Sequence, residues 1–417
     1  TVTIRARYII GADGGRSFVR EAVNIELEGD TAPMKWLVVD VKDDTWDAPY
    51  SAVYTSPKRP SMTIPLPFGY RRFEFKVLDG EDPDRMAEPE MVATLMKQFY
   101  PDGEVPEAAR RRIYWHHSRT ASRFQDGRVF LVGDAAHPHP PFFGQGMNSG
   151  MRDVTNLAWK LGMVLSESAS PGLLGTYDSE RREIARDMVQ FATGIGRLYH
   201  PANRGTEFIR NLFFRGVQRI PGARDYILQM KYKPTPRYQD GFVLNDDVDS
   251  SSPVGRAFPQ PVVEKMDGTR LGLDDILGTK IALVGVAGGV IEGLSPEVAA
   301  RLAAHNGVVV QSHVPSVYRR KGQINPLARD TTSEIPIVDV YDTEGGLRDL
   351  YLAHPDIQVY IVRPDRYVAA VSSIADLNSK VESLLTMLGT PGGADAASNS
   401  VDTGGERVGD ARRPSSR

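Results

Sequence analysis

The clearest pattern along the chain is a short apolar run followed by a long stretch with apolar residues at helical spacing. Residues 129–132 read Val-Phe-Leu-Val, which is typical of a strand that is covered on both faces. After a glycine turn and a proline-rich loop, apolar side chains recur every three or four positions over residues 147–161, which predicts an amphipathic helix. Asp134 follows the strand after the single residue Gly133, at the end where ligands bind in open α/β sheets.

The remaining pattern predicts two further units. Alternating residues predict an antiparallel sheet with strands at 35–41, 51–55, 61–65, 71–78 and 112–119 and a helix at 89–100. A helix is predicted at 173–195, and we expect its charged residues at 180–182 to make surface and interdomain contacts rather than to act in catalysis. A separate βα unit has strands at 281–286, 308–311, 359–362 and 368–371 and helices at 295–305 and 376–388. We therefore expect segments at 1–30, 31–120 and 121–232, a linker at 233–261, a domain at 262–388 and a disordered tail at 389–417.

The composition of the chain excludes several kinds of site and of binding partner. The chain has 417 residues, a net charge of −3 and no cysteine, so disulfides and thiolate metal sites are excluded. The charge provides no electrostatic case for nucleic acid or membrane binding, and no apolar run reaches about 18 residues. No His, Asp or Glu spacing indicates a metal site. We expect a cytoplasmic protein.

Two glycine-rich turns carry the candidate chemistry. Residues 8–20 read YIIGADGGRSFVR, in which glycines allow a tight turn and Ser17 is placed to cap a following helix. Before the long helix, Gly144 and Gly146 leave backbone N–H groups uncovered. Such a helix N-terminus stabilises negative charge on a ligand.

The run 127–161, GRVFLVGDAAHPHPPFFGQGMNSGMRDVTNLAWKL, resembles the second FAD-binding motif of the flavoprotein aromatic hydroxylases. The resemblance implies that Asp134 hydrogen-bonds the ribityl chain of FAD. It also implies that the loop from Pro141 to Asn148 packs along the isoalloxazine. The segment 8–20 resembles the Asp-Gly motif of the same family, which serves FAD and nicotinamide. The cofactor-binding residues carried over are Asp13, Gly14, Arg20, Gly133, Asp134, Pro141, Gly144, Gln145, Gly146, Met147 and Asn148.

The resemblance also implies a fold and a reaction. The fold is α/β: a partial FAD-binding Rossmann-like domain with an inserted antiparallel substrate-binding sheet, and a thioredoxin-like C-terminal α/β domain that here lacks cysteine. NADH or NADPH reduces FAD, O₂ forms a C4a-hydroperoxide, and a phenolic substrate is hydroxylated. Residues 36–40, Trp-Leu-Val-Val-Asp, and the loop 140–146 resemble the 3-(3-hydroxyphenyl)propionate hydroxylase branch.

Several points stay open at this stage. His116 and His117 are weak candidates for a catalytic base on a strand. His137 and His139 tempt a catalytic interpretation, although loop histidines more often bond neighbouring backbone. No G-x-G-x-x-G occurs between a strand and a helix, so we expect the C-terminal part of a longer enzyme. The alternatives are another FAD oxidoreductase, such as an epoxidase or reductase, or a truncated non-catalytic fragment that serves as an interaction module. The expected partners are a small phenol and O₂, and a homodimer is left open.

Overall fold

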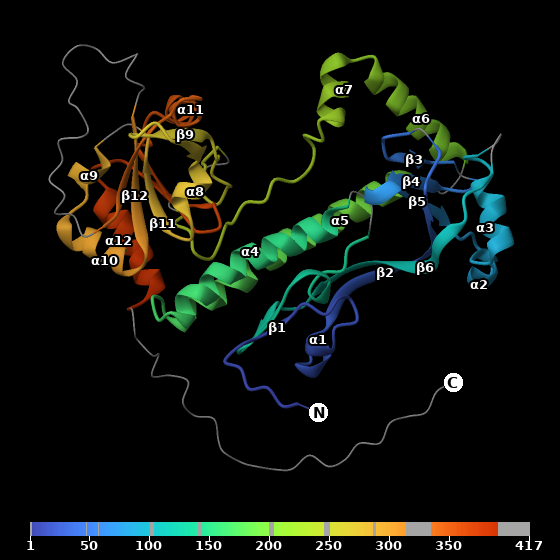
Figure 1. Cartoon of the computed structure of the whole chain (residues 1–417), viewed down its shortest axis with the longest axis horizontal. Helices are drawn as coiled ribbons and strands as arrows, with labels where there is room; N and C mark the ends of the chain where they lie inside the picture. The colour runs from blue at the N-terminus through green and yellow to red at the C-terminus, as the bar shows by residue number, and fades with distance from the viewer. Residues whose placement is uncertain are drawn as a thin grey trace.

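The structure is a computed structural model that describes residues 2–46, 48–56, 58–100, 104–140, 144–199, 204–245, 251–286, 289–313 and 335–390. The described residues form three sheets, and long helices separate the first two sheets along the chain from the third (Figure 1). The longest helices, α4 (Gln145–Leu165) and α5 (Thr176–Tyr199), lie between the sheets in Figure 1. No helix among the described residues is both long enough and apolar enough to span a membrane.

The first unit surrounds the two glycine-rich turns. It comprises β1 (Ile9–Gly11), α1 (Phe18–Ala22), β7 (Gln125–Asp126), β8 (Val129–Leu131), the 3₁₀ turns η2 (Gly133–Ala135) and η3 (Pro171–Gly175), α4 and α5. The sheet order is β1-β8-β7, with β1 parallel to β8 and β7 antiparallel to it. The helix predicted at 173–195 is thus a 3₁₀ turn followed by α5, which continues four residues further.

The second unit is an antiparallel sheet in the order β3-β4-β5-β2-β6. Its elements are β2 (Leu27–Lys42), β3 (Ala52–Tyr54), β4 (Ser61–Pro65), η1 (Pro67–Gly69), β5 (Tyr70–Lys76), α2 (Pro83–Met86), α3 (Pro89–Met96) and β6 (Ala108–Ala121). One face packs Leu37, Val39, Phe73 and Phe75 against Val92 and Met96 of α3. The pattern located every strand but shortened β2 and β6, because their shared ladder extends into polar residues that show no apolar alternation.

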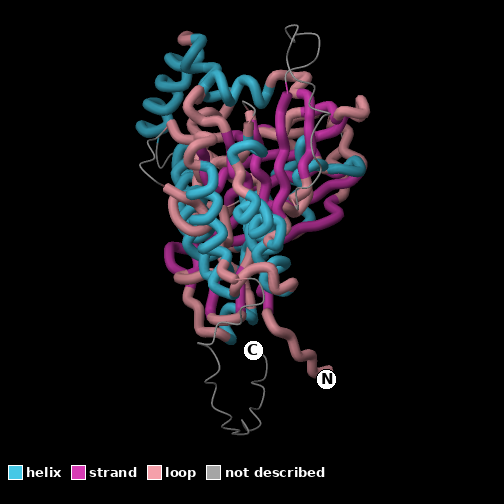
Figure 2. Tube along the Cα trace, turned by 90° about the vertical axis from the view of Figure 1, so that its left-hand side faces the viewer, coloured by secondary structure: helices cyan, strands magenta, loops and turns pink. Residues whose placement is uncertain are grey.

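Two helices, α6 (Arg204–Gln218) and α7 (Pro221–Leu228), follow α5 and lie at the top of the molecule in both views (Figures 1 and 2). Arg210 of α6 is buried and donates hydrogen bonds to the Thr55 carbonyl, 3.4 Å away, just after β3. The sequence pattern did not predict these two helices, which lie within the segment that we expected at 121–232.

The C-terminal domain contains a seven-stranded sheet in the order β10-β9-β13-β12-β11-β14-β15. Its elements are β9 (Val262–Lys265), β10 (Arg270–Gly272), α8 (Leu273–Leu277), β11 (Ile281–Gly285), α9 (Val290–Gly293), α10 (Pro296–Ala304), β12 (Gly307–His313), β13 (Ile337–Tyr341), α11 (Gly346–Ala353), β14 (Val359–Val362), β15 (Val368–Ser372) and α12 (Leu377–Leu388). Parallel β11 and β12 are joined through α10, and the antiparallel pair β14–β15 is followed by α12. This is the predicted thioredoxin-like arrangement.

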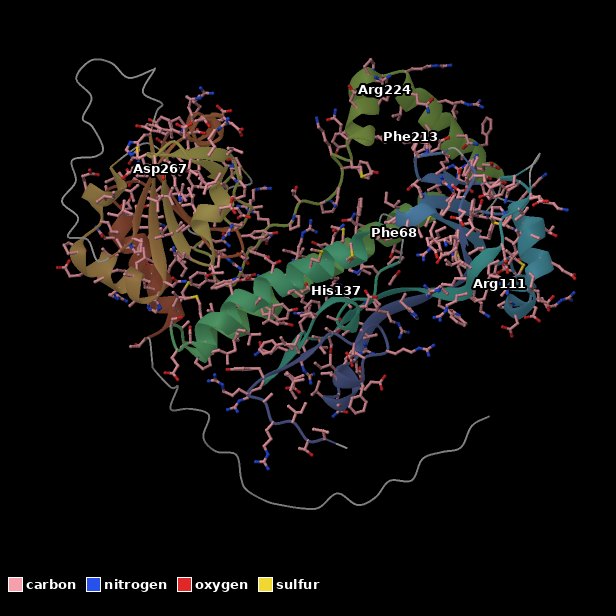
Figure 3. All side chains as sticks on the ribbon, viewed as in Figure 1. Phe68, Arg111, His137, Phe213, Arg224 and Asp267 are labelled. Carbon is pink, nitrogen blue, oxygen red and sulfur yellow. The ribbon has the colours of Figure 1, made fainter. Side chains whose placement is uncertain are left out.

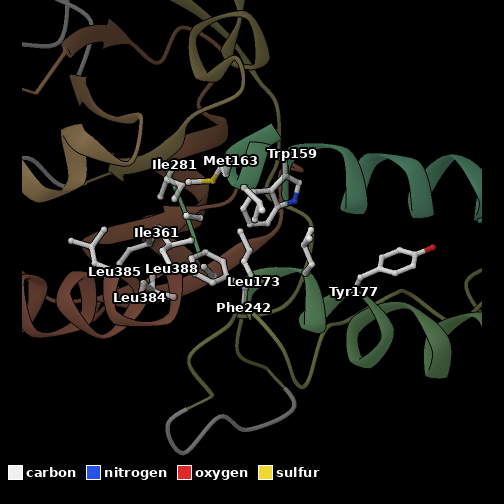
Figure 4. Packing of buried hydrophobic residues seen from close by; sticks show 14 of the residues in the cluster. Trp159, Met163, Leu173, Tyr177, Phe242, Ile281, Ile361, Leu384, Leu385 and Leu388 are labelled. Atoms are coloured by element: carbon white, nitrogen blue, oxygen red, sulfur yellow. The ribbon is translucent and has the colours of Figure 1, made fainter. Parts of the chain in front are cut away.

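The C-terminal domain shares a hydrophobic core with the first unit. Trp159, Met163 and Leu173 belong to the same buried cluster as Ile361 and Leu384 (Figure 4). Burying each such side chain stabilises the folded state by about 1.5–3 kcal/mol relative to leaving it exposed. The shared core therefore stabilises the contact between the two units.

The segment 233–261, which we expected to be a linker, is part of this packing. Its described residues bury Tyr238, Phe242, Val254 and Phe258, and the N–H of Leu244 donates to the carbonyl of Ala369 in β15. Apolar side chains spaced among prolines and polar residues reveal no periodicity, which is why the pattern resembled a solvated connection. The predicted tail falls almost wholly on residues 391–417, outside the described residues.

Candidate functional site

The Asp-Gly turn after β1 (residues 11–15) and the Gly-Asp turn after β8 (Gly133–Ala135) lie next to each other because β1 and β8 are parallel neighbours. Ile9, Ile10 and Gly11 pair with Val129, Phe130 and Leu131, and the N–H of Val132 donates to the Gly11 carbonyl at 3.0 Å. Parallel strands present their carboxyl ends at one edge of a sheet. The segment after β1 and the segment after β8, which carry Asp13 and Asp134, therefore start from the same edge.

Arg20 joins the two turns directly. Its side chain is buried, and Nη1 lies 3.1 Å from the carbonyl oxygen of Gly15 and 3.1 Å from that of Ala135. Ser17, the N-cap of α1, accepts the backbone N–H of Arg20 at 3.0 Å and places this side chain. Arg20 thus bridges the Asp-Gly segment and the Gly-Asp turn, while its predicted direct contact with a cofactor stays a prediction.

Asp13 is exposed and stabilises the start of α1. Its Oδ2 accepts the N–H of Val19 at 3.0 Å. Desolvation would raise the pKa of Asp13, but hydrogen bonds from the Ser17 side chain and from backbone N–H groups outweigh it and hold that pKa below its usual value. Gly14 has a φ of +82°, a conformation that glycine adopts without strain.

Asp134 differs from Asp13 because its carboxylate stays available. The residue is exposed, and among the described residues none hydrogen-bonds its carboxylate. It faces the start of α4: a Cβ placed on Gly146 would lie 3.8 Å from Asp134 Oδ1 and 3.7 Å from His139 Cβ. A glycine at position 146 therefore leaves room beside the carboxylate.

The first turn of α4 leaves its backbone donors open. Its N-cap, Gly144, has a left-handed conformation with φ 58° and supplies no side-chain cap. Uncapped N–H groups and the helix dipole favour a negatively charged or carbonyl-bearing group at this end. Gln145 is buried, Met147 is exposed, and Asn148 donates back to the Gly144 carbonyl at 3.4 Å. Pro141 lies outside the described residues.

The long strand β6 brings positive charge to the same region. His117 is mostly exposed, but the partial desolvation of its ring, followed by the charges of Arg119 and Arg16, lowers its pKa, while the charge of Asp134 opposes the shift. Arg119, Arg16 and Asp134 are therefore each within electrostatic reach of His117. Sequence reasoning named His117 and Asp134 but missed Arg16 and Arg119. The sequence could have indicated both arginines. Arg16 directly follows the Asp-Gly-Gly turn, and Arg119 lies two positions after His117, on the same face of the strand.

His116 also belongs to β6, but its side chain lies outside the described residues. His137 lies beside α4 (Figure 3), and it forms a local hydrogen-bond network with His139 and Asp153. His137 is buried and its Nε2 lies 2.5 Å from Asp153 Oδ2, while His139 Nδ1 lies 2.6 Å from the His137 carbonyl. Burial, then repulsion from His137, lowers the pKa of His139 to about 4. Both rings thus bond neighbouring groups, as loop histidines more often do.

The charged residues at 180–182 were expected at the surface and at interdomain contacts. Glu180 and Arg181 are instead fully buried. Glu180 pairs with Lys160 Nζ at 2.7 Å and with Arg363 of the C-terminal domain at 2.6 Å, so the interdomain part of the expectation holds and the surface part is wrong for these two residues. Spacing alone did not reveal that their charges are neutralised in pairs.

The fold is that of an α/β protein with an inserted antiparallel sheet, and comparison with known proteins relates it to FAD-binding proteins. Residues 1–192 match the model of an FAD binding domain, and residues 255–387 match that of the HcaD C-terminal domain. The chain is 41% identical over 372 residues to a 3-(3-hydroxy-phenyl)propionate/3-hydroxycinnamic acid hydroxylase of Burkholderia cenocepacia, covering 89% of this chain and 67% of the relative. The chain belongs to the flavoprotein aromatic hydroxylase family.

Other relatives carry the same description. A hydroxylase 2 of that name from Burkholderia vietnamiensis is 42% identical over 367 residues, covering 88% of this chain and 66% of the relative. The chain thus spans about two thirds of the length of the curated relatives it matches. Among solved structures, the flavin-dependent monooxygenase PieE in complex with FAD and substrate matches with a TM-score of 0.67 and 20% identity, covering 92% of this chain and 71% of PieE. This likeness confirms the fold.

Proposed function

We propose that this chain binds FAD and takes part in the NAD(P)H- and O₂-dependent hydroxylation of a small phenol of the 3-(3-hydroxyphenyl)propionate kind. The observation that carries the proposal is the junction made by Arg20. It holds the two turns together and leaves the Asp134 carboxylate exposed beside the glycine-lined start of α4. The relatives named as hydroxylases of this substrate class support it.

The described residues fit the groups that FAD presents. The Asp134 carboxylate would accept hydrogen bonds from ribityl hydroxyls, and the room beside Gly146 would admit the cofactor. The open N–H groups that follow Gly144 would face negative charge on the flavin ring. When bound, FAD supplies the oxidation of NAD(P)H and the activation of O₂.

The residues near His117 suit a phenol that carries a carboxylate. Arg16 and Arg119 would attract the carboxylate, because both guanidinium groups lie within electrostatic reach of His117. The lowered pKa of His117 favours the neutral form of its ring near pH 7. The neutral ring would be able to accept a proton from the phenol. A cytoplasmic location would suit an enzyme that consumes NAD(P)H.

The first test asks whether the 417-residue chain retains flavin. The purified chain is mixed with FAD, desalted and examined by its visible absorbance, and its mass in solution is measured on the same sample. Asp134→Ala is compared with Asp126→Ala, which alters a half-exposed carboxylate in β7. We expect flavin to stay with the wild-type chain and the Asp126 variant and to be lost from the Asp134 variant. Absence of flavin from the wild-type chain would contradict binding by this chain.

The second test asks which reaction follows. Flavin-loaded chain is given NADH or NADPH with 3-(3-hydroxyphenyl)propionate, and the product is identified by mass spectrometry. A catechol formed in step with NAD(P)H oxidation supports the hydroxylase. Oxidation that is independent of the phenol indicates a different FAD oxidoreductase.

A further inference from the structure

A buried carboxylate on α4, that of Asp153, is hydrogen-bonded to the Gly-Asp turn. Asp153 is fully buried, and its Oδ2 accepts the backbone N–H of Gly133 at 2.9 Å and Nε2 of His137 at 2.5 Å. Its Oδ1 accepts Nε of Arg181 at 2.9 Å. Three donors from the turn, from the following loop and from α5 therefore meet on one side chain.

We propose that Asp153 is a positioning residue that fixes the turn Gly133–Ala135, so that the neighbouring Asp134 carboxylate stays directed toward the start of α4. As a statement about a cofactor site, the inference rests on the proposed function; as a statement about the turn, it stands on these contacts alone. Among the described residues its hydrogen-bond partners are Gly133, His137 and Arg181, none of which is exposed, so Asp153 would act through Gly133 and His137.

The turn is short, and the two residues at its contact with α4, Gly133 and Gly150, are glycines that have no side chains to fix its orientation. It is a three-residue 3₁₀ segment that starts at Gly133, whose φ is +60°. A Cβ placed on Gly150 of α4 would lie only 3.1 Å from the Gly133 Cα, so the two backbones pack closely. Close packing limits the approach of the turn to α4, whereas the hydrogen bond to Asp153 sets its direction.

The charge of Asp153 is balanced by Arg181. Burial would raise the pKa of Asp153, but the attraction of His137 and Arg181 outweighs it and keeps the group ionised. The carboxylate accepts from three donors at once, whereas an asparagine in its place has one acceptor oxygen and presents an N–H₂ group to the other donors. Asp153→Asn must therefore lose at least one of the three bonds and leave Arg181 without its counter-ion.

Asp178 provides a matched control on the neighbouring helix. Its Oδ1 also accepts a backbone N–H, that of Phe124 at 2.6 Å, and its Oδ2 pairs with Arg182 at 3.2 Å. Phe124 precedes β8, so this bond does not reach the Gly-Asp turn. Asp178→Asn thus removes the same chemical group from a similar bond, away from residues 133–135.

Hydrogen exchange of the full chain without added cofactor tests the turn. We expect Asp153→Asn to raise the exchange rate of the amides at residues 133–137 about tenfold or more. Asp178→Asn should leave those amides unchanged and loosen residues 120–126 and Leu131, whose N–H donates to the Phe124 carbonyl. In a second variant, Asp153→Leu with Arg181→Met, apolar side chains replace the buried pair, a change that many proteins tolerate. It should fold and still exchange rapidly at residues 133–137. Wild-type exchange there in this folded double variant, which keeps no side-chain acceptor at position 153 for the Gly133 N–H, overturns the inference.

Affinity for FAD then separates the inference from the proposed function. Flavin fluorescence is titrated with the wild-type chain and each variant, and we expect both Asp153 variants to bind about tenfold or more weakly and Asp178→Asn to bind like wild type. Equal affinity of the wild type and the Asp153 variants overturns the inference while FAD binding stands. A wild-type chain that binds no FAD contradicts the proposed function, and the exchange data still decide the role of Asp153 in the turn.

Discussion

Arg363 of the C-terminal domain and Glu180 of α5 form a buried two-point ion pair. Nη1 of Arg363 lies 2.9 Å from Oε1 of Glu180, and Nη2 lies 2.6 Å from Oε2. Asp365 binds the other edge of the guanidinium, and Lys160 pairs with Glu180. These contacts and the shared core join the C-terminal domain to α4 and α5, and α4 packs against the Gly-Asp turn.

Removing Arg363 should therefore destabilise the whole chain. Arg363→Met leaves the carboxylates of Glu180 and Asp365 buried, with Lys160 as the one remaining ion-pair partner among the described residues, and such losses typically cost about 3–5 kcal/mol. Urea unfolding measures the difference in the free energy of unfolding. Arg301→Met is the control, because its pair with Glu382 is half-exposed and should change stability by less than about 1 kcal/mol. Equal effects of the two substitutions would contradict this account.

The hydroxyl of Tyr177 should stabilise the strand that leads to the Gly-Asp turn. It donates to the Leu131 carbonyl at 2.7 Å, and the side chain is fully buried. Tyr177→Phe leaves that carbonyl without this donor, at a cost of about 1–3 kcal/mol. Thermal unfolding should show a clear drop for Tyr177→Phe and none for Tyr351→Phe, which alters an exposed ring.

Glycines on α4 should respond differently to alanine. At Gly150 a Cβ would lie 3.1 Å from Gly133 Cα, whereas at Gly162 nothing lies within 4 Å. We expect Gly162→Ala to stabilise the chain by about 0.5–1 kcal/mol through helix propensity. Gly150→Ala should lose that gain by displacing the turn and should weaken FAD binding several-fold. Fluorescence titration alongside thermal unfolding checks both, and unchanged FAD affinity of Gly150→Ala would argue against the close packing.

Glu74 should make stability depend on pH. Burial raises its pKa to about 7, against the opposing charge of Arg72. Because the folded state holds this proton more tightly than the unfolded state, stability falls as the pH rises from the unfolded pKa of about 4.5 toward 7. The effect is up to about 3 kcal/mol. Glu74→Gln should flatten this part of the profile and raise stability at pH 8, measured by urea unfolding at several pH values. An unchanged slope would rule out Glu74 as its source.

Local patterns were sufficient for the parts of the site that depend on adjacent residues. The apolar run before Gly133 and the helical spacing after Gly146 predict the strand, the turn and α4, because backbone geometry imposes those periods on any chain that buries one face. The Ser17 cap and the strand at 61–65 follow from residue types within a few positions. The family resemblance rested on these same local runs.

Contacts between distant residues depended on the tertiary structure. Arg20 reaches Ala135, Asp153 reaches Arg181, and Glu180 reaches Arg363, yet each pair is separated by many residues. A charged residue has the same sequence signal whether water or a buried partner neutralises it, so neither the burial of Glu180 nor the junction made by Arg20 could be predicted. The sequence by itself determined the strand, turn and helix around Asp134 and the chemical groups that they present, and only packing decided which groups stay exposed and which hold the turns in place.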